Sequence, residues 1–369
     1  MRVLIAPDTF KSSLPADAVA EALARGWLAQ RPDDEVVRRP MADGGEGTLD
    51  AIVAAVDDAR AHVVPEITGP DGRRRDARFV LLPNRVAVLE LAETSGLPLM
   101  KELDALGATT RGLGELIEVA IQRGAQRVMI TLGGSATTDG ATGALRALGL
   151  ELVDDAGVTL PDGGGALERL ARFGTSRLKP PPSHGVEVIT DVENPLLGPD
   201  GAATVFGPQK GATDRDIAVL ERGLARLAEL TGGNPDAPGA GAAGGAGYGL
   251  ATFWGATLRP GSEAIAEVVG IPEQLARCDL AITGEGTLDA TSLRGKVPGY
   301  IADRCREAQR PLAIVAGHVA LPPDQWPTER VVSTSILAGS AQRSLAEPAR
   351  WLEAAGAQLA IDQQNQEPA

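Results

Sequence analysis

The sequence has little of what marks a secreted, zinc-binding or membrane-spanning protein. Only two of its 369 residues are cysteine, Cys278 and Cys305, which excludes a scaffold held together by disulfide bonds. The three histidines lie far apart in the sequence and argue against a histidine-based zinc site. No stretch approaches the roughly 18 consecutive apolar residues of a membrane-spanning helix, and no signal-peptide pattern opens the chain. We therefore expect a cytoplasmic protein that has no membrane partner.

Positive charge is also scarce. The chain has 35 Lys and Arg against 49 Asp and Glu, for a formal net charge of -14, and this balance argues against nucleic acid as a partner. Five of the basic residues are lysine: Lys11, Lys101, Lys179, Lys210 and Lys296. In a chain that uses Arg for ordinary positive charges, a lysine is a candidate for a position that needs a compact ammonium group, such as one beside a phosphate. Nothing in the sequence indicates the oligomeric state.

The hydrophobic pattern predicts strands that alternate with helices. Short apolar runs that end in glycine-rich or polar turns predict strands at residues 2–6, 35–39, 127–132, 186–190, 279–283, 312–316 and 330–333. The clearest helix is expected at 216–230, after a capping-box-like pair formed by Thr213 and Asp216. Two alternating runs around residues 69–72 predict an antiparallel hairpin, and the Gly/Ala-rich segment 232–249 predicts a loop. The whole predicts an α/β fold with mostly parallel sheets.

Five polar clusters follow predicted strands, where ligands bind in open α/β sheets. They occupy residues 8–13, 42–48, 131–140, 191–195 and 283–296. Each also has a structural interpretation as a turn, a helix cap or a solvated side chain. The cluster at 131–140 is the strongest, because backbone N–H groups and small hydroxyls before a helix suit a phosphate.

Several familiar catalytic patterns are missing. The cluster at 131–140 lacks the lysine pattern of a P-loop, and the GxGxxG match at 239–244 follows no predicted strand, which argues against dinucleotide binding. No Ser-His-Asp order, no GxSxG and no paired Cys and His support a covalent nucleophile. The acids, lysines and glycine-rich loops that remain suit phosphoryl transfer, and we expect two domains that close around the substrate.

Seven motifs, which run in order along nearly the whole chain, resemble those of the bacterial glycerate kinase family that is distinct from the ribokinase-like glycerate kinases. They are APDTFK at 6–11, MADGGEGT at 41–48, GGSAT at 133–137, DVENPL at 191–196, FGPQKGA at 206–212, GAGAAGG at 239–245, and ITGEG at 282–286 with GKVP at 295–298. Among the small departures, Ala141 stands where the family usually has glycine.

The resemblance implies two α/β domains, one of them inserted into a Rossmann- or flavodoxin-like domain, with the active site in the cleft. We expect residues 1–61 and 275–369 to form the discontinuous domain and residues 62–274 the inserted one. The implied reaction transfers the γ-phosphoryl group of ATP to D-glycerate with Mg²⁺ and favours the 2-phosphate over the 3-phosphate. Two alternatives stay open: a non-catalytic sensor of a small hydroxy acid, or a kinase of a related hydroxy acid.

The roles expected within these motifs follow from the chemistry of each side chain. Asp191 is the first choice for the general base on the substrate hydroxyl, and Asp8 is its rival. Lys11 and Lys296 are expected to neutralise phosphate and carboxylate charge during catalysis. Mg²⁺ would be held, directly or through water, by Asp43, Glu46 and Glu285. The residues expected to bind substrate or phosphate are Gly133, Gly134, Ser135, Thr137, Asn194, Lys210 and Gly284.

Overall fold

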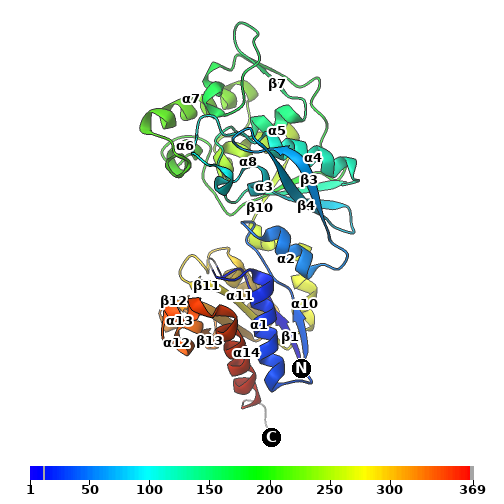
Figure 1. The fold of residues 1–369 in the computed structure, drawn as a ribbon, viewed down its shortest axis with the longest axis vertical. Coiled ribbons are helices and arrows are strands. Elements are labelled where there is room, and N and C mark those ends of the chain that lie inside the picture. The colour runs from blue at the N-terminus through cyan, green and yellow to red at the C-terminus, as the bar shows by residue number, and fades with distance from the viewer. Residues whose placement is uncertain (11–12, 366–369) are drawn as a thin grey trace. The chain divides into compact units, whose positions relative to one another are not determined.

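The computed structural model describes residues 1–10 and 13–365, so the predicted catalytic Lys11 lies outside the described residues. Strands and helices alternate along most of the chain, and both large sheets are mostly parallel, which confirms the predicted α/β class. The chain packs into two compact units, which Figure 1 shows with their elements labelled. Unit 1 comprises residues 1–43, 50–57 and 260–369, and unit 2 comprises residues 44–49 and 58–259.

Unit 1 is built from segments on both sides of unit 2 in the sequence. The structure places residues 260–274 in unit 1, whereas the sequence-based boundary puts them in the inserted domain. These residues include α9 (Gly261–Val268) and the start of α10 (Ile271–Arg277), which contact each other, and α10 also contacts a strand of unit 1. The domain assignment itself stays a prediction.

The sheet of unit 1 has five parallel strands. Their spatial order is β13 (Val331–Ser333), β12 (Leu312–Val319), β11 (Leu280–Leu288), β1 (Arg2–Ile5), β2 (Glu35–Arg38). Counted along the chain, this is the order 2-1-3-4-5 of flavodoxin-like folds. The order of connections reverses between β1 and β11, and such a switch point is where these sheets bind ligands.

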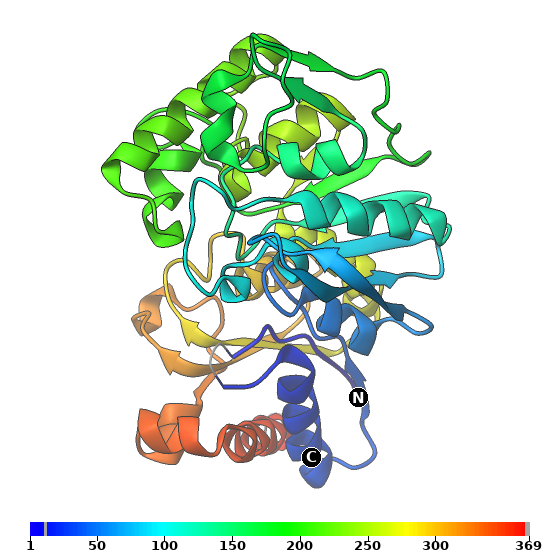
Figure 2. The same cartoon turned by 45° about the horizontal axis from the view of Figure 1, so that its top comes forward.

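Two long helices, α1 (Ala16–Gln30) and α14 (Pro348–Gln364), lie side by side against this sheet (Figures 1 and 2). Helix α1 turns an apolar face to the sheet: Val19, Leu23 and Trp27 are fully buried in one core with residues of β1 and β11. Pro15 occupies the N-cap position of α1, and no side chain caps the helix. Proline is favoured at a helix start because it has no N–H to leave unsatisfied.

The remaining helices of unit 1 lie beside the strand ends or contact the sheet. Helix α11 (Val297–Glu307) contacts β11 and β12. Two short helices, α12 (Thr334–Ala338) and α13 (Ala341–Ala346), follow β13 and lead into α14. Helix α2 (Thr48–Ala55) begins in the segment that packs with unit 2 and continues in unit 1. The 3-10 turn η4 spans Pro323–Gln325.

The sheet of unit 2 has six strands and is mixed. Its order is β10 (Thr257–Arg259), β9 (Val186–Ile189), β6 (Arg127–Thr131), β5 (Val86–Glu90), β4 (Arg74–Leu81), β3 (Arg60–Thr68). The first four strands are parallel, whereas β3 and β4 form the predicted antiparallel hairpin. A separate small hairpin pairs β7 (Glu151–Val153) with β8 (Arg172–Gly174).

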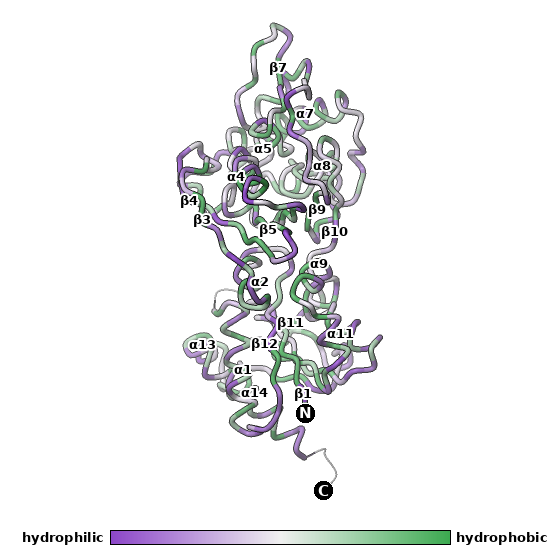
Figure 3. The backbone as a smooth tube through the Cα atoms, turned by 90° about the vertical axis from the view of Figure 1, so that its right-hand side faces the viewer, coloured by the Kyte–Doolittle hydropathy of each residue, from purple (hydrophilic) through white to green (hydrophobic). Residues whose placement is uncertain are grey.

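Helices and short turns surround this sheet. They are α3 (Ala92–Ser95), α4 (Arg111–Gln122), α5 (Thr142–Ala147), α6 (Ala202–Phe206), α7 (Asp214–Thr231) and α8 (Ala242–Trp254), with the 3-10 turns η1 (Leu97–Leu99), η2 (Gly164–Arg169) and η3 (Pro208–Lys210). Figure 3 shows hydrophobic residues along interior strands such as β5 and β12. Of the helices in the described part of the chain, none is long and apolar enough to span a membrane.

Two predictions about local structure in unit 2 have different outcomes. The capping box at the start of α7 is confirmed, since Thr213 and Asp216 cap each other's backbone N–H groups. The loop predicted for 232–249 is partly wrong, because α8 begins at Ala242. The first turn of α8 is irregular: Ala243, Gly244 and Gly245 have φ of 50°, 66° and 86°. Two glycines tolerate this left-handed backbone, which explains why a glycine-rich segment can start a helix here.

Candidate active site

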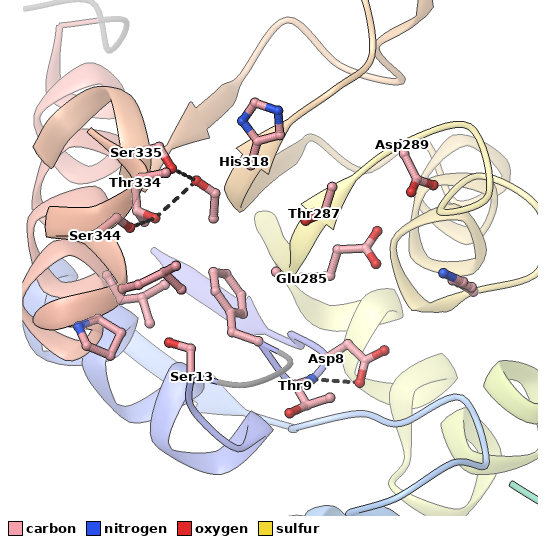
Figure 4. A pocket seen from close by; sticks show the side chains of 18 of the residues that line it. Asp8, Thr9, Ser13, Glu285, Thr287, Asp289, His318, Thr334, Ser335 and Ser344 are labelled. Carbon is pink, nitrogen blue, oxygen red and sulfur yellow. Dashed lines mark hydrogen bonds between the residues drawn. The ribbon is translucent and has the colours of Figure 1, made fainter. Parts of the chain in front are cut away.

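A cavity of about 330 Å³ opens at the carboxyl edge of the unit 1 sheet (Figure 4). Asp8 and Thr9, which follow β1, line it together with Glu285 and Thr287 of β11. These two strands flank the switch point of the sheet. The cavity therefore lies where a doubly wound sheet is expected to bind its ligand.

The two ends of this cavity differ in chemistry, because they lie beyond different strands. The carboxylate end lies at the carboxyl ends of β1, β2 and β11 and consists of Asp8, Asp43, Glu285, Asp289 and Lys296. The hydroxyl end lies beyond β13 and consists of Thr334, Ser335, Ser344, Leu345 and Pro348. Figure 4 shows Asp8, Glu285 and Asp289 on one side of the cavity and Thr334, Ser335 and Ser344 on the other.

The acids next to the switch point are largely buried. Asp8 is 5% exposed and Glu285 is 8% exposed. The Thr9 N–H donates to Asp8 Oδ1 at 2.6 Å, and the Asp8 N–H donates to the carbonyl of Gly284 at 2.8 Å. A Cβ on Gly284 would lie 2.0 Å from the carbonyl oxygen of Val315. The structure thus gives Gly284 a packing reason to be glycine, and its predicted part in binding phosphate stays a prediction.

Lys296 and Asp289 line the same cavity. Lys296 occupies the N-cap position of α11. The N–H and hydroxyl groups of Thr291 donate to Asp289 Oδ1 at 2.7 and 2.6 Å. These hydrogen bonds, and the nearby charge of Lys296, lower the pKa of Asp289. The carboxylate end therefore combines ionised acid with one positive charge.

The three predicted metal ligands do not share one described cluster. Asp43 and Glu285 both line the cavity of unit 1, whereas Glu46 is exposed in the segment that packs with unit 2. Within residues 1–10 and 13–365, no three side chains of His, Cys, Asp or Glu form a group that could hold a metal ion. Carboxylates are suitable ligands for Mg²⁺, which proteins usually hold through one or two carboxylates together with substrate phosphates. The donor set at the carboxylate end fits that mode of binding.

In unit 2, the glycine-rich loop after β6 has an exposed part and a buried part. Gly134 is exposed and Gly133 half-buried, whereas Ser135 is 6% exposed and Thr137 is fully buried. Lys210 Nζ donates to Ser135 Oγ at 3.0 Å and to the carbonyl of Thr137 at 2.6 Å. The structure thus brings together three of the residues predicted to bind substrate or phosphate, but the amine of Lys210 donates to the Ser135 hydroxyl and the Thr137 carbonyl.

Lys210 is 2% exposed. Burial lowers the pKa of Lys210 to about 7, against the opposing attraction of Asp139. Burial also raises the pKa of Asp139, even though the N–H and hydroxyl groups of Thr110 both donate to Asp139 Oδ2 at 2.9 Å. The amine of Lys210 supports the loop from inside, and direct contact of Lys210 with a phosphate stays a prediction.

The Lys210→Met variant is expected to change how stability depends on pH. The folded protein releases the proton of Lys210 near pH 7, whereas the unfolded chain keeps it up to about 10.5. Between these values the unfolded state binds more protons, so this group makes the free energy of unfolding rise with pH by up to about 1.4 kcal/mol per unit. Urea unfolding from about pH 7.5 to 9 should give a steeper rise for the wild type than for the variant. If the free energy of unfolding rises equally with pH in the two proteins, the lowered pKa of Lys210 is wrong.

Asp191 and Asn194 follow β9, which runs parallel to β6, so their loop leaves the same edge of the unit 2 sheet as the glycine-rich loop. Asp191 is exposed. The side chain of Asn194 donates from Nδ2 to the carbonyl of Asp200 at 2.9 Å, and its own carbonyl accepts from the Gly241 N–H at 2.9 Å. Asn194 therefore holds the shape of its loop, and its predicted contact with substrate is not tested.

Sequence reasoning missed the hydroxyl end of the unit 1 cavity. The carbonyl of Gly317 accepts hydrogen bonds from the hydroxyls of Ser335, at 2.5 Å, and Thr334, at 3.4 Å. The Thr334 and Ser344 hydroxyls lie 2.7 Å apart. Isolated Ser and Thr residues on short helices form no recognisable motif, so only the folded chain brings them together.

Known proteins are similar to this chain over nearly its whole length. The model of the glycerate kinase family matches residues 3–363. The chain is 41% identical over 326 residues to glycerate 2-kinase of Escherichia coli (strain K12), with 86% of this chain and 85% of that protein covered. It is 41% identical over 329 residues to glycerate kinase of Bacillus subtilis (strain 168), with 87% and 86% covered. The crystal structure of a proposed glycerate kinase 2 from Salmonella typhimurium LT2 has a TM-score of 0.86 at 37% identity and covers 99% of both chains.

Proposed function

The chain belongs to the glycerate kinase family, and from that membership we propose that it transfers the γ-phosphoryl group of ATP to a hydroxyl group of D-glycerate. The membership confirms the resemblance inferred from the seven motifs, and the chain is a phosphotransferase whose acceptor is an alcohol group. The name of the Escherichia coli relative, a 2-kinase, supports the 2-phosphate over the 3-phosphate as product. The cytoplasmic location stays a prediction.

The cavity of unit 1 is the observation that carries this proposal. Phosphoryl transfer needs positioning and charge stabilisation more than covalent chemistry. The carboxylate end offers Lys296 as a positive charge and buried acids beside it, at the switch point of the sheet. A cavity with this lining suits a phosphate chain that arrives with a divalent cation.

Mg²⁺ is the cation we propose. Its ligands would be Asp43 and Glu285, which line the cavity. Glu46 stays a predicted third ligand, directly or through water. When bound, the ion neutralises phosphate charge. Lys296 would add its charge to the same phosphates, and Asp8, which lines the cavity, would hold a hydroxyl or a water-bound ligand.

The proton of the substrate hydroxyl needs an acceptor as the new bond to phosphorus forms. We keep Asp191 as the first choice, because it is an exposed carboxylate at the carboxyl edge of the unit 2 sheet. Asp8 is the rival, and its burial at 5% exposure suits a carboxylate that works with little water around it.

The proposal is tested by the formation of ADP that depends on D-glycerate. With Mg²⁺ and ATP, we expect ADP to appear in proportion to D-glycerate and much more slowly with other small hydroxy acids. Faster turnover of another hydroxy acid would favour a kinase of that acid. Binding of D-glycerate without any ADP would favour the non-catalytic sensor and contradict the proposal.

A further inference from the structure

The hydroxyl end of the unit 1 cavity includes apolar side chains, which a phosphate group does not need for binding. The apolar lining consists of Leu345 on α13, Pro348 and Leu352 on α14, and Phe10 after β1. Leu345 is 61% exposed. A large apolar side chain exposed at the rim of a cavity is suited to cover a flat, uncharged ring.

The hydroxyls at this end are arranged as hydrogen-bond acceptors. Because Ser335 donates its proton to the carbonyl of Gly317 at 2.5 Å, its oxygen keeps lone pairs for another donor. Ser335 lines the cavity and is half-buried. An exocyclic amine on a ring would be a complementary donor.

The two ends of the cavity lie beyond different strands of one sheet. The carboxylate end lies at the carboxyl ends of β1, β2 and β11, and the hydroxyl end lies beyond β13, with β12 between them. Figure 4 shows His318, which lies near the end of β12, between Ser335 and Thr287. An elongated ligand with a charged phosphate chain at one end and an aminated ring at the other matches this order.

We propose that the hydroxyl end binds the nucleoside part of the phosphoryl donor, with its phosphates at the carboxylate end. This assignment rests on the proposed function, because it takes the donor to be a nucleoside triphosphate. Adenosine, which carries a ring amine, fits the acceptor Ser335, and Leu345 covers its ring.

The test separates the two ends of the cavity with two probes. Adenosine is a neutral probe of the hydroxyl end, and inorganic tripolyphosphate with Mg²⁺ is a probe of the carboxylate end. In Leu345→Glu, calorimetry should show adenosine affinity reduced at least about tenfold and tripolyphosphate affinity unchanged within about twofold. An equal loss for both probes would mean that the substitution disturbs the whole cavity, and it would overturn the assignment.

A matched control is available on the neighbouring helix. Ile336 is 79% exposed on α12 and is not among the residues that line the cavity. Ile336→Glu adds the same charge at a similar surface position, where substitutions usually leave stability nearly unchanged. It should bind adenosine like the wild type. If Ile336→Glu and Leu345→Glu lose the same amount of affinity for adenosine, the assignment is wrong.

Inosine tests the hydroxyl contact separately. It has a carbonyl where adenosine has its amine, so the wild type should bind it about fivefold more weakly if Ser335 accepts from that amine. Equal affinity would overturn the contact with Ser335.

The result also distinguishes this inference from the proposed function. A protein that binds adenosine in a Leu345-dependent way but forms no ADP with D-glycerate would keep the nucleoside site and lose the proposed acceptor. A protein that forms ADP from D-glycerate while Leu345→Glu binds adenosine normally, or while the wild type binds none, would keep the kinase and lose the nucleoside site. Loss of D-glycerate affinity in Leu345→Glu would instead assign the hydroxyl end to the acceptor.

Discussion

Replacing Asp191 by Asn is expected to lower kcat by about 10²–10⁴-fold, the usual contribution of a general base. Asn keeps the size and shape of the side chain but cannot accept the proton of the substrate hydroxyl. Because Asp191 is exposed, the substitution should leave the melting temperature nearly unchanged. The measurement is the rate of D-glycerate-dependent ADP formation at saturating substrates.

The neighbouring Glu193 provides the matched control. Glu193 is exposed in the same loop, so Glu193→Gln removes one negative charge without removing the proposed base. Its kcat should stay within about twofold of the wild type. If Asp191→Asn retains its activity while Asp8→Asn loses it, the base is Asp8, and the assignment of Asp191 is wrong.

The second large effect is expected from Gly244→Ala, on stability rather than on chemistry. Gly244 has φ of 66°, and a Cβ there would lie 2.0 Å from the carbonyl oxygen of Thr137 and 2.5 Å from the Cα of Thr138. Both neighbours are backbone atoms of the fully buried part of the glycine-rich loop, so they cannot move without shifting that loop. We expect a loss of about 3 kcal/mol or more in the free energy of unfolding, together with a raised KM, measured by urea unfolding and by initial rates.

Gly232 separates the steric clash from the backbone conformation. It has φ of 67°, almost the same as Gly244, but a Cβ there would have no atom within 4 Å. Gly232→Ala should therefore cost only the left-handed conformation of an alanine, about 1–2 kcal/mol. Equal losses in the two variants would show that the contact with Thr137 contributes nothing. Ala141 has φ of 58°, so this chain already contains an alanine in the left-handed conformation.

The sequence predicts the fold because the fold depends on local signals. Apolar runs predicted all five strands of the unit 1 sheet and most strands of the unit 2 sheet, and the pair Thr213 and Asp216 predicted the start of α7. The short edge strand β10 was not predicted. The first turn of α8 escaped prediction, since glycines that favour loops in isolation adopt their left-handed backbone here to pack against the loop around Thr137.

The candidate site was predicted only in part, because burial depends on contacts between distant residues. The motifs drew attention to Asp8, Glu285 and Lys296, which the structure places around one cavity. The sequence could not show that Lys210 points into the interior of unit 2, since its partners Ser135 and Thr137 are about 75 residues away. Nor could it show that α12 and α13 bring hydroxyls and Leu345 to the far end of that cavity.

The central claim is transfer of a phosphoryl group from ATP to D-glycerate, and the ³¹P NMR spectrum of the reaction tests it most directly. With Mg²⁺, ATP and D-glycerate, a new phosphomonoester signal should grow in step with ADP. Coupling of that signal to one proton identifies the favoured 2-phosphate, whereas coupling to two protons identifies the 3-phosphate. ADP that appears with inorganic phosphate and no phosphomonoester, or no reaction at all, would contradict the account.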